Sequence, residues 1–197
     1  MKAIYGYNAA KEATGEYQKL PAGGYVCKIL KVEDVEQKEY LKITFDIYEG
    51  AYKGWYQEQR ERLLDAGFSV EYVGTTSRSY KQSALGFFKA FINAVDESNG
   101  TNFGPYVEYG LDEQKLVGCL VGFVIGYEEY EKKTGGIGER ERVAYQKAIQ
   151  KIRTGDFKIP ALKKFGKAMN HSQETSPGQS NSISYSVLNS DDIGLPF

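Results

Sequence analysis

The chain has 197 residues, 41% of them hydrophobic and 14% aromatic, and it carries a formal net charge of −1 at pH 7. These proportions are enough for one buried core, while the longest apolar run, residues 116–127, is shorter than the roughly 20 residues of a membrane helix. Two cysteines and one histidine exclude a disulfide framework and a four-ligand zinc site, and residues 1–18 lack the apolar segment of a signal peptide, so we expect a soluble cytoplasmic protein.

Alternating apolar and polar residues indicate three strands in the first third of the chain. The first lies at residues 25–35 and the second at residues 40–50, where apolar and polar side chains fall on opposite faces. After a turn at residues 50–54, residues 55–64 are predicted to form the third strand, whose even positions continue an aromatic and basic surface.

One amphipathic helix and one hairpin follow these strands. Residues 83–98 have apolar side chains at helical spacing, with Ser83 as the expected N-cap and Asn99-Gly100 as the expected end. Residues 116–131 and 138–149 alternate like strands, and the connection between them is rich in glycine. We predict that they pair as a hairpin.

The order of three strands, one helix and two strands is that of the OB barrel, in which the helix plugs one end. We therefore predict a mainly β fold: a five-stranded OB-type barrel with one helix between strands 3 and 4, followed by a disordered C-terminal tail. Gly118, Gly122 and Gly126 share one face of the fourth strand, where they ease barrel bending or let a ligand backbone approach. OB barrels bind nucleic acid at the faces of strands 2 and 3 and at loops 1-2 and 4-5.

Aromatic and basic side chains gather on the predicted second and third strands. Aromatic rings stack on bases while Lys and Arg neutralise phosphates, so this mixture favours single-stranded nucleic acid as the ligand. The chain is most basic at residues 140–167, where nine basic residues face two acidic ones. The predicted nucleic-acid-binding residues are Tyr40, Lys42, Tyr48, Tyr52, Lys53, Trp55, Tyr56, Arg60, Arg62, Arg78, Lys81, Arg140 and Arg142.

No motif in the sequence indicates catalysis. The single histidine, His171, lies in a polar segment, so no Ser-His-Asp, Cys-His or metal-ligand constellation can be assembled around it. The glycines of residues 134–138 lack the third glycine of a phosphate-binding loop and fit the tip of a hairpin better. We expect no enzymatic activity, no metal and no cofactor.

A change of composition near residue 169 marks the end of the predicted OB-type domain, residues 1–169. Residues 170–190 are rich in Ser, Gln, Asn and Gly and too poor in apolar side chains to fold, so they are predicted to form a flexible linker. Residues 191–197 follow the linker and combine two carboxylates with an apolar end. The residues of this predicted tip are Asp191, Asp192, Ile193, Leu195, Pro196 and Phe197.

The sequence DDIGLPF at residues 191–197 resembles the acidic, Pro-Phe-terminated tip of bacterial single-stranded-DNA-binding proteins, with Gly194 and Leu195 inserted before the Pro-Phe pair. Other segments resemble single-stranded-DNA-binding proteins encoded by phages and prophages of Gram-positive bacteria, and this resemblance covers roughly residues 15–165. The segments are LPAGGYVCKILKVEDVEQKEYLKITFDIYEG, KGWY, ALGFFKAFINAV, KLVGCLVGFVIGYEEY and IRTGDFKIPALKK.

The resemblance implies that the protein binds single-stranded DNA without strong sequence preference during phage DNA replication and recombination. It also implies a location in the cytoplasm of the bacterial host and recruitment of replication and recombination enzymes by the tip. Two other functions remain open: an RNA-binding OB module, and an adaptor that binds only proteins through its tail. The sequence pattern leaves the oligomeric state open, a homo-oligomer included.

Overall fold

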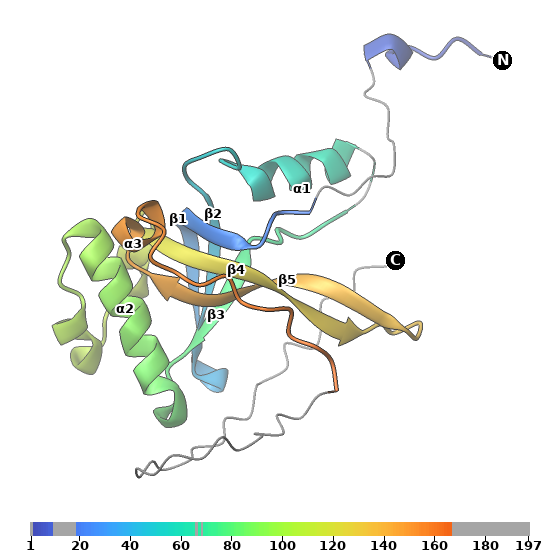
Figure 1. The fold of residues 1–197 in the computed structure, drawn as a ribbon. Helices are drawn as coiled ribbons and strands as arrows, with labels where there is room; N and C mark the ends of the chain where they lie inside the picture. Colours follow the sequence, from blue (N-terminus) through green and yellow to red (C-terminus); the bar gives the residue numbers. More distant parts are fainter. Residues whose placement is uncertain (1, 10–18, 66, 68, 167–197) are drawn as a thin grey trace.

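The computed structural model describes residues 2–9, 19–65, 67 and 69–166. The predicted linker and the predicted tip at residues 191–197 lie outside the described residues, as does the predicted domain end at residue 169. Five strands form one antiparallel sheet in the order β3-β2-β1-β4-β5 (Figure 1). They are β1 (Gly23–Val35), β2 (Tyr40–Ile47), β3 (Thr75–Ser79), β4 (Leu120–Glu131) and β5 (Ile137–Lys147).

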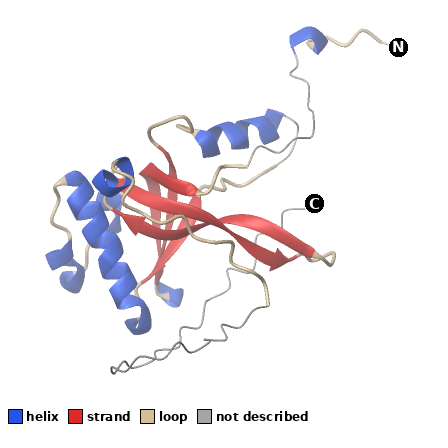
Figure 2. Ribbon diagram, in the orientation of Figure 1, coloured by secondary structure: helices blue, strands red, loops and turns tan. Residues whose placement is uncertain are grey.

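Three α-helices and several 3-10 turns connect and flank the strands. Figure 2 shows the helices in blue and the strands in red. The helices are α1 (Trp55–Asp65), α2 (Leu85–Asn99) and α3 (Ile149–Arg153). The 3-10 turns are η1 (Tyr7–Ala9), η2 (Glu36–Lys38), η3 (Gln82–Ala84), η4 (Gly104–Tyr109) and η5 (Glu113–Leu116).

The prediction of a mainly β fold with five strands, and with a helix between the third and fourth, is confirmed. Strand pairing ends at β3 on one side and at β5 on the other, so the sheet is not closed into a barrel. The predicted hairpin is also confirmed, because β4 and β5 pair along most of their length and enclose the glycine-rich turn at residues 132–136.

The predicted third strand at residues 55–64 is wrong, because these residues form the helix α1. Its sequence is rich in Gln, Glu, Arg and Leu, which favour helices more strongly than the Tyr and Arg at even positions favour a strand. Asp46, at the end of β2, accepts hydrogen bonds from the backbone N–H groups of Tyr56 and Gln57 and so satisfies the first turn of this helix. The third strand is instead β3, a short segment rich in Ser and Thr.

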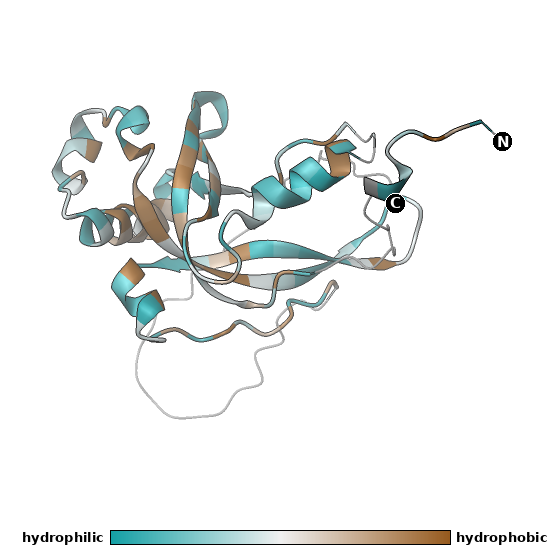
Figure 3. Cartoon of the chain, turned by 90° about the horizontal axis from the view of Figure 1, so that it is seen from above, coloured by the Kyte–Doolittle hydropathy of each residue, from teal (hydrophilic) through white to brown (hydrophobic). Residues whose placement is uncertain are grey.

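The main core lies between the sheet and α2. Phe45 of β2 and Phe123 of β4 meet in an edge arrangement, with their ring centroids 4.7 Å apart, and Phe91 of α2 is fully buried in the same cluster. Figure 3 shows hydrophobic residues, in brown, concentrated where α2 meets the strands. Because α2 contacts β3, β4 and β5, it reaches from one edge strand of the sheet to the other.

The ends of α2 differ in how well the sequence predicted them. The helix ends as expected at Gly100. This residue has a left-handed φ of 66°, a conformation that glycine adopts without strain. The expected N-cap at Ser83 is wrong, because the chain first makes the η3 turn and the N-cap residue of α2 is Ala84. A preceding 3-10 turn shifts the helix start without any change in the apolar spacing.

A second, smaller core lies on the opposite face of the sheet, where α3 covers β1 and β4. Val26, Val124, Ile149 and Ile152 are buried there. A Cβ atom added to Gly122 would lie 2.3 Å from Ile152 Cγ1, and one added to Gly126 would lie 2.5 Å from Pro160 Cγ. These two glycines therefore make room for side chains of the segment that follows β5, and not for a ligand.

Candidate nucleic-acid interface

The outer face of β1 and β2, opposite α2, carries three lysines. Lys28 pairs with Asp46, Lys31 pairs with Thr44, and Lys42 pairs with Glu33, so all three side chains lie on the same face of the sheet. Lys28 and Lys31 are three residues apart, and strict alternation would place them on opposite faces. A bulge between Ile29 and Lys31 shifts the register and brings them to one face.

Tyr48 follows β2 on this surface and has two cations beside its ring. Its side chain is 43% exposed, and the Nζ atoms of Lys28 and Lys53 each lie 5.9 Å from the ring centroid. We call Lys28, Tyr48 and Lys53 the Tyr48 cluster. An exposed ring flanked by ammonium groups matches a base and its phosphates, because the ring stacks while the cations meet the charge.

Two more of the predicted residues, Tyr40 and Lys42, lie half-buried on the outer face of β2. Lys81 is half-buried just after β3. Together with the Tyr48 cluster, Tyr40 and Lys42 give this face the mixture of rings and cations that the sequence predicted. Lys28 and Lys31 were missed as site residues, because the bulge that unites them has no clear signature in a single sequence.

Tyr52, Trp55 and Tyr56 were expected on the same surface, and the structure corrects this expectation for two of them. Trp55 is 8% exposed and Tyr56 is 4% exposed, while Tyr52 is half-buried with its ring edge-on to Trp55 at 5.5 Å. The Tyr56 hydroxyl donates to Glu141 at 3.1 Å. The turn into α1 carries these rings into the core, where large aromatic side chains bury the most area.

Arg60 and Arg62 lie on α1, the helix that forms where the third strand was predicted. Arg62 is exposed and reaches Glu58 at 4.0 Å, an ion pair one helical turn back. Arg60 is half-buried, and its Nε has no hydrogen-bond partner. Helical geometry separates them, because positions two apart on a helix do not share a face.

Arg78 of β3 points inward rather than toward the outer face. It pairs with Leu41, and its guanidinium carbon lies 5.4 Å from the ring centroid of Phe123 and 5.8 Å from that of Phe91. Burial lowers the pKa of this guanidinium to about 10, which leaves it charged at neutral pH. The expectation that Arg78 lies on the binding surface is therefore wrong.

Arg140 and Arg142 lie on the outer face of the β4–β5 hairpin and share one carboxylate. Glu128 is 2.8 Å from Arg140 Nε, 3.8 Å from Arg142 Nε and 3.4 Å from Lys163 Nζ. The guanidinium of Arg140 also lies 5.4 Å from the ring centroid of Tyr130. We call Glu128, Arg140, Arg142 and Lys163 the hairpin cluster, and its three cations exceed its one carboxylate by two charges. The outer half of this hairpin is mostly hydrophilic (Figure 3).

Comparison with protein-family models, with curated proteins and with solved structures gives no significant match to any of them. Within the part of the chain that the structure describes, no group of three or more His, Cys, Asp and Glu side chains is arranged to hold a metal ion. No helix among the described residues is both long and apolar enough to cross a membrane.

Proposed function

We propose that the protein binds single-stranded DNA through the outer face of β1 and β2 together with the hairpin cluster. The observation that carries this proposal is the Tyr48 cluster, an exposed ring with two lysine ammonium groups 5.9 Å from its centroid, on the sheet face opposite α2. The strand order β3-β2-β1-β4-β5, with α2 between β3 and β4, supports an OB-type fold. In that fold the faces of strands 2 and 3 and the loops 1-2 and 4-5 bind oligonucleotides, and the proposed interface shares with this set strand β2 and the β4–β5 hairpin.

The charges of the two clusters suit a flexible polyanion. Lys28 and Lys53 have no ion pair among the described residues, so their charge is free to meet phosphate. A protein that neutralises phosphates releases counterions, so its affinity falls as the salt concentration rises. For a single strand, each phosphate contact contributes roughly −0.7 to the slope of log K against log[salt]. The number of contacts can therefore be measured.

The first test is a fluorescence-anisotropy titration with labelled oligothymidylate, oligouridylate and duplex DNA at several salt concentrations. The Lys28→Ala, Lys53→Ala double variant should flatten the slope of log K against log[salt] by about 1.4, which corresponds to two lost contacts. Tyr48→Leu should weaken binding by about 1–3 kcal/mol, the loss of one stacked base, and leave the slope unchanged.

The matched control is the Lys89→Ala, Lys115→Ala double variant, which removes the same charge from exposed positions on α2 and η5. Its affinity and slope should equal those of the wild-type protein. If the wild-type protein binds no single strand, or if both double variants lose the same slope, the proposed interface is wrong. Tighter binding of oligouridylate than of oligothymidylate would favour the RNA-binding alternative.

We also propose, from the sequence, that residues 191–197 recruit replication or recombination proteins. Deleting these residues should leave the melting temperature unchanged and oligonucleotide affinity equal or higher, while binding of a purified partner is lost. A clear fall in melting temperature with partner binding intact would make the segment part of the fold.

A further inference from the structure

An open hollow lies between the end of β5 and the segment that follows α3. It has a volume of about 510 Å³ and is lined by Tyr145, Lys147, Gly155, Asp156, Phe157 and Lys158. We call it the β5 hollow. Neither the Tyr48 cluster nor the hairpin cluster contributes to its lining.

Hydrogen bonds fix the segment that forms the wall of this hollow. The Tyr145 hydroxyl donates to the carbonyl of Lys158 at 2.6 Å and accepts from the N–H of Lys158 at 2.9 Å. The turn at Gly155 has a φ of +74°, and the ring of Phe157 packs against the small core beneath α3. The rings of Tyr145 and Phe157 and the backbone of Lys158 are therefore held in place without a ligand.

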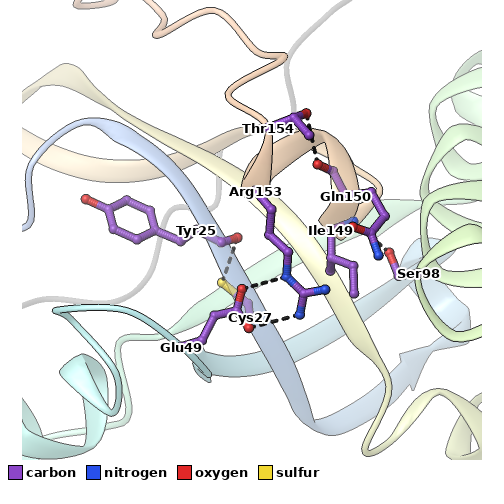
Figure 4. Close-up of polar contacts among 8 residues, drawn as sticks. All are labelled: Tyr25, Cys27, Glu49, Ser98, Ile149, Gln150, Arg153 and Thr154. Carbon is purple, nitrogen blue, oxygen red and sulfur yellow. Dashed lines mark hydrogen bonds and ion pairs between the residues drawn. The ribbon is translucent and has the colours of Figure 1, made fainter.

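The β5 hollow lies on the same outer surface as the proposed interface. On one side, Arg153 of α3 makes a two-pronged ion pair with Glu49 at 2.9 and 3.0 Å (Figure 4), and Glu49 directly follows Tyr48 in the chain. On the other side, a register shift in β5 places Tyr145 opposite Val124 and Arg142 opposite Gly126. Arg142 and Tyr145 thus share the outer face of β5, and the hollow lies next to the hairpin cluster.

The lining of the β5 hollow carries more positive than negative charge. Lys147 and Lys158 have no ion pair within the described residues, and Asp156 is the one carboxylate in the lining. Exposed Lys151 lies nearby on α3 and adds a third cation. Two aromatic rings with lysines at the rim provide apolar surface for a base and cations for the phosphates on either side of it.

We propose that the β5 hollow binds one nucleotide of the single strand, which runs from the hairpin cluster through the hollow to the Tyr48 cluster. The base lies against Phe157 and Tyr145, and its phosphates lie at Lys147 and Lys158. This inference rests on the proposed function and extends it, because α3 and residues 154–158 become part of the binding surface.

Lysine reactivity and the salt slope test the inference separately. Acetylation of surface lysines, read by mass spectrometry, should fall several-fold at Lys147 and Lys158 when oligothymidylate saturates the protein, while Lys89 on α2 stays equally reactive. The Lys147→Ala, Lys158→Ala double variant should flatten the salt slope by about 1.4, and the Lys89→Ala, Lys115→Ala control should not.

The outcomes distinguish the failure of this inference from the failure of the proposed function. If oligothymidylate protects Lys28 and Lys53 but not Lys147 and Lys158, and the slope is unchanged, the strand does not pass through the hollow and only this inference falls. If no lysine is protected and no binding is seen, both proposals fall. Protection of Lys147 and Lys158 by an oligoglutamate but not by oligothymidylate would instead assign the hollow to an acidic peptide.

Discussion

At the scale of single residues, Asp46 connects the sheet to α1. Only 8% of its surface is exposed, so its charge lies inside the fold. Its two carboxylate oxygens accept from the N–H groups of Ile47, Tyr56 and Gln57 and from the hydroxyl of Tyr72. Four donors replace the water that burial removes, so the charge is tolerated without an ion pair.

Replacing Asp46 should therefore destabilise the fold strongly. Asp46→Ala leaves buried N–H groups at the start of α1 without an acceptor, and we expect a loss of about 3 kcal/mol in the free energy of unfolding. Urea denaturation followed by circular dichroism measures this loss. Asp65→Asn, at the exposed end of the same helix, is the control and should change stability by less than about 0.5 kcal/mol. Equal effects of the two substitutions would contradict the capping role.

Single aromatic residues also show what the sequence does not reveal, which is whether a ring is exposed or buried. Tyr48 and Lys53 were identified because an aromatic and a basic residue near a strand end are visible in the sequence. Trp55 and Tyr56 have the same composition signal, yet they are buried, because a large ring fits a core as well as it fits a base. Only the position of α1 decides between these two environments.

At the scale of elements, the regular segments were easier to predict than the irregular ones. The hairpin and α2 have long periodic patterns that match their structure. β3 has only five residues and little apolar alternation, and α1 begins directly after a turn, so the strand was placed at the wrong segment. The segment after β5 packs on β4 through a few apolar residues separated by turns, a pattern too short to be recognised as part of the fold.

That packing leads to a prediction at Gly122. A Cβ atom there would lie 2.3 Å from Ile152 Cγ1 and 2.8 Å from the carbonyl oxygen of Lys147, so α3 would be displaced from the sheet. Gly122→Ala should lower the free energy of unfolding by about 1–3 kcal/mol, as overpacking of a core does. Thermal denaturation measures the change.

Gly86 of α2 provides the control for this substitution. Nothing lies within 4 Å of a Cβ atom at Gly86, and its surroundings are exposed helix. Gly86→Ala should be neutral or stabilise the protein by up to about 1 kcal/mol, because alanine favours the helix. If Gly122→Ala is as well tolerated as Gly86→Ala, α3 does not pack on β4 as described.

At the scale of the whole molecule, Glu141 links parts of the fold that are far apart in sequence. It lies on β5 and accepts from Tyr56 of α1 at 3.1 Å, and it also interacts with Tyr127 of β4 and with the backbone of Leu20 before β1. Burial raises the pKa of this carboxyl group above its ordinary value of 4.5, although these hydrogen bonds oppose the shift. The folded protein therefore holds the proton more tightly than the unfolded chain.

The raised pKa gives a pH dependence of stability with a definite sign. Between pH 4.5 and the higher pKa of the folded state, the unfolded chain has already lost the proton that the folded protein keeps, so stability falls as pH rises through this window. Glu141→Gln removes this titration. The melting temperature of the variant minus that of the wild-type protein should therefore become more positive from about pH 4 to about pH 8. Glu139→Gln, on the same strand at an exposed site, gives the reference trend to subtract. A difference that is flat or falls with pH would mean that Glu141 is ionised in the fold at no cost, and that burial does not raise its pKa.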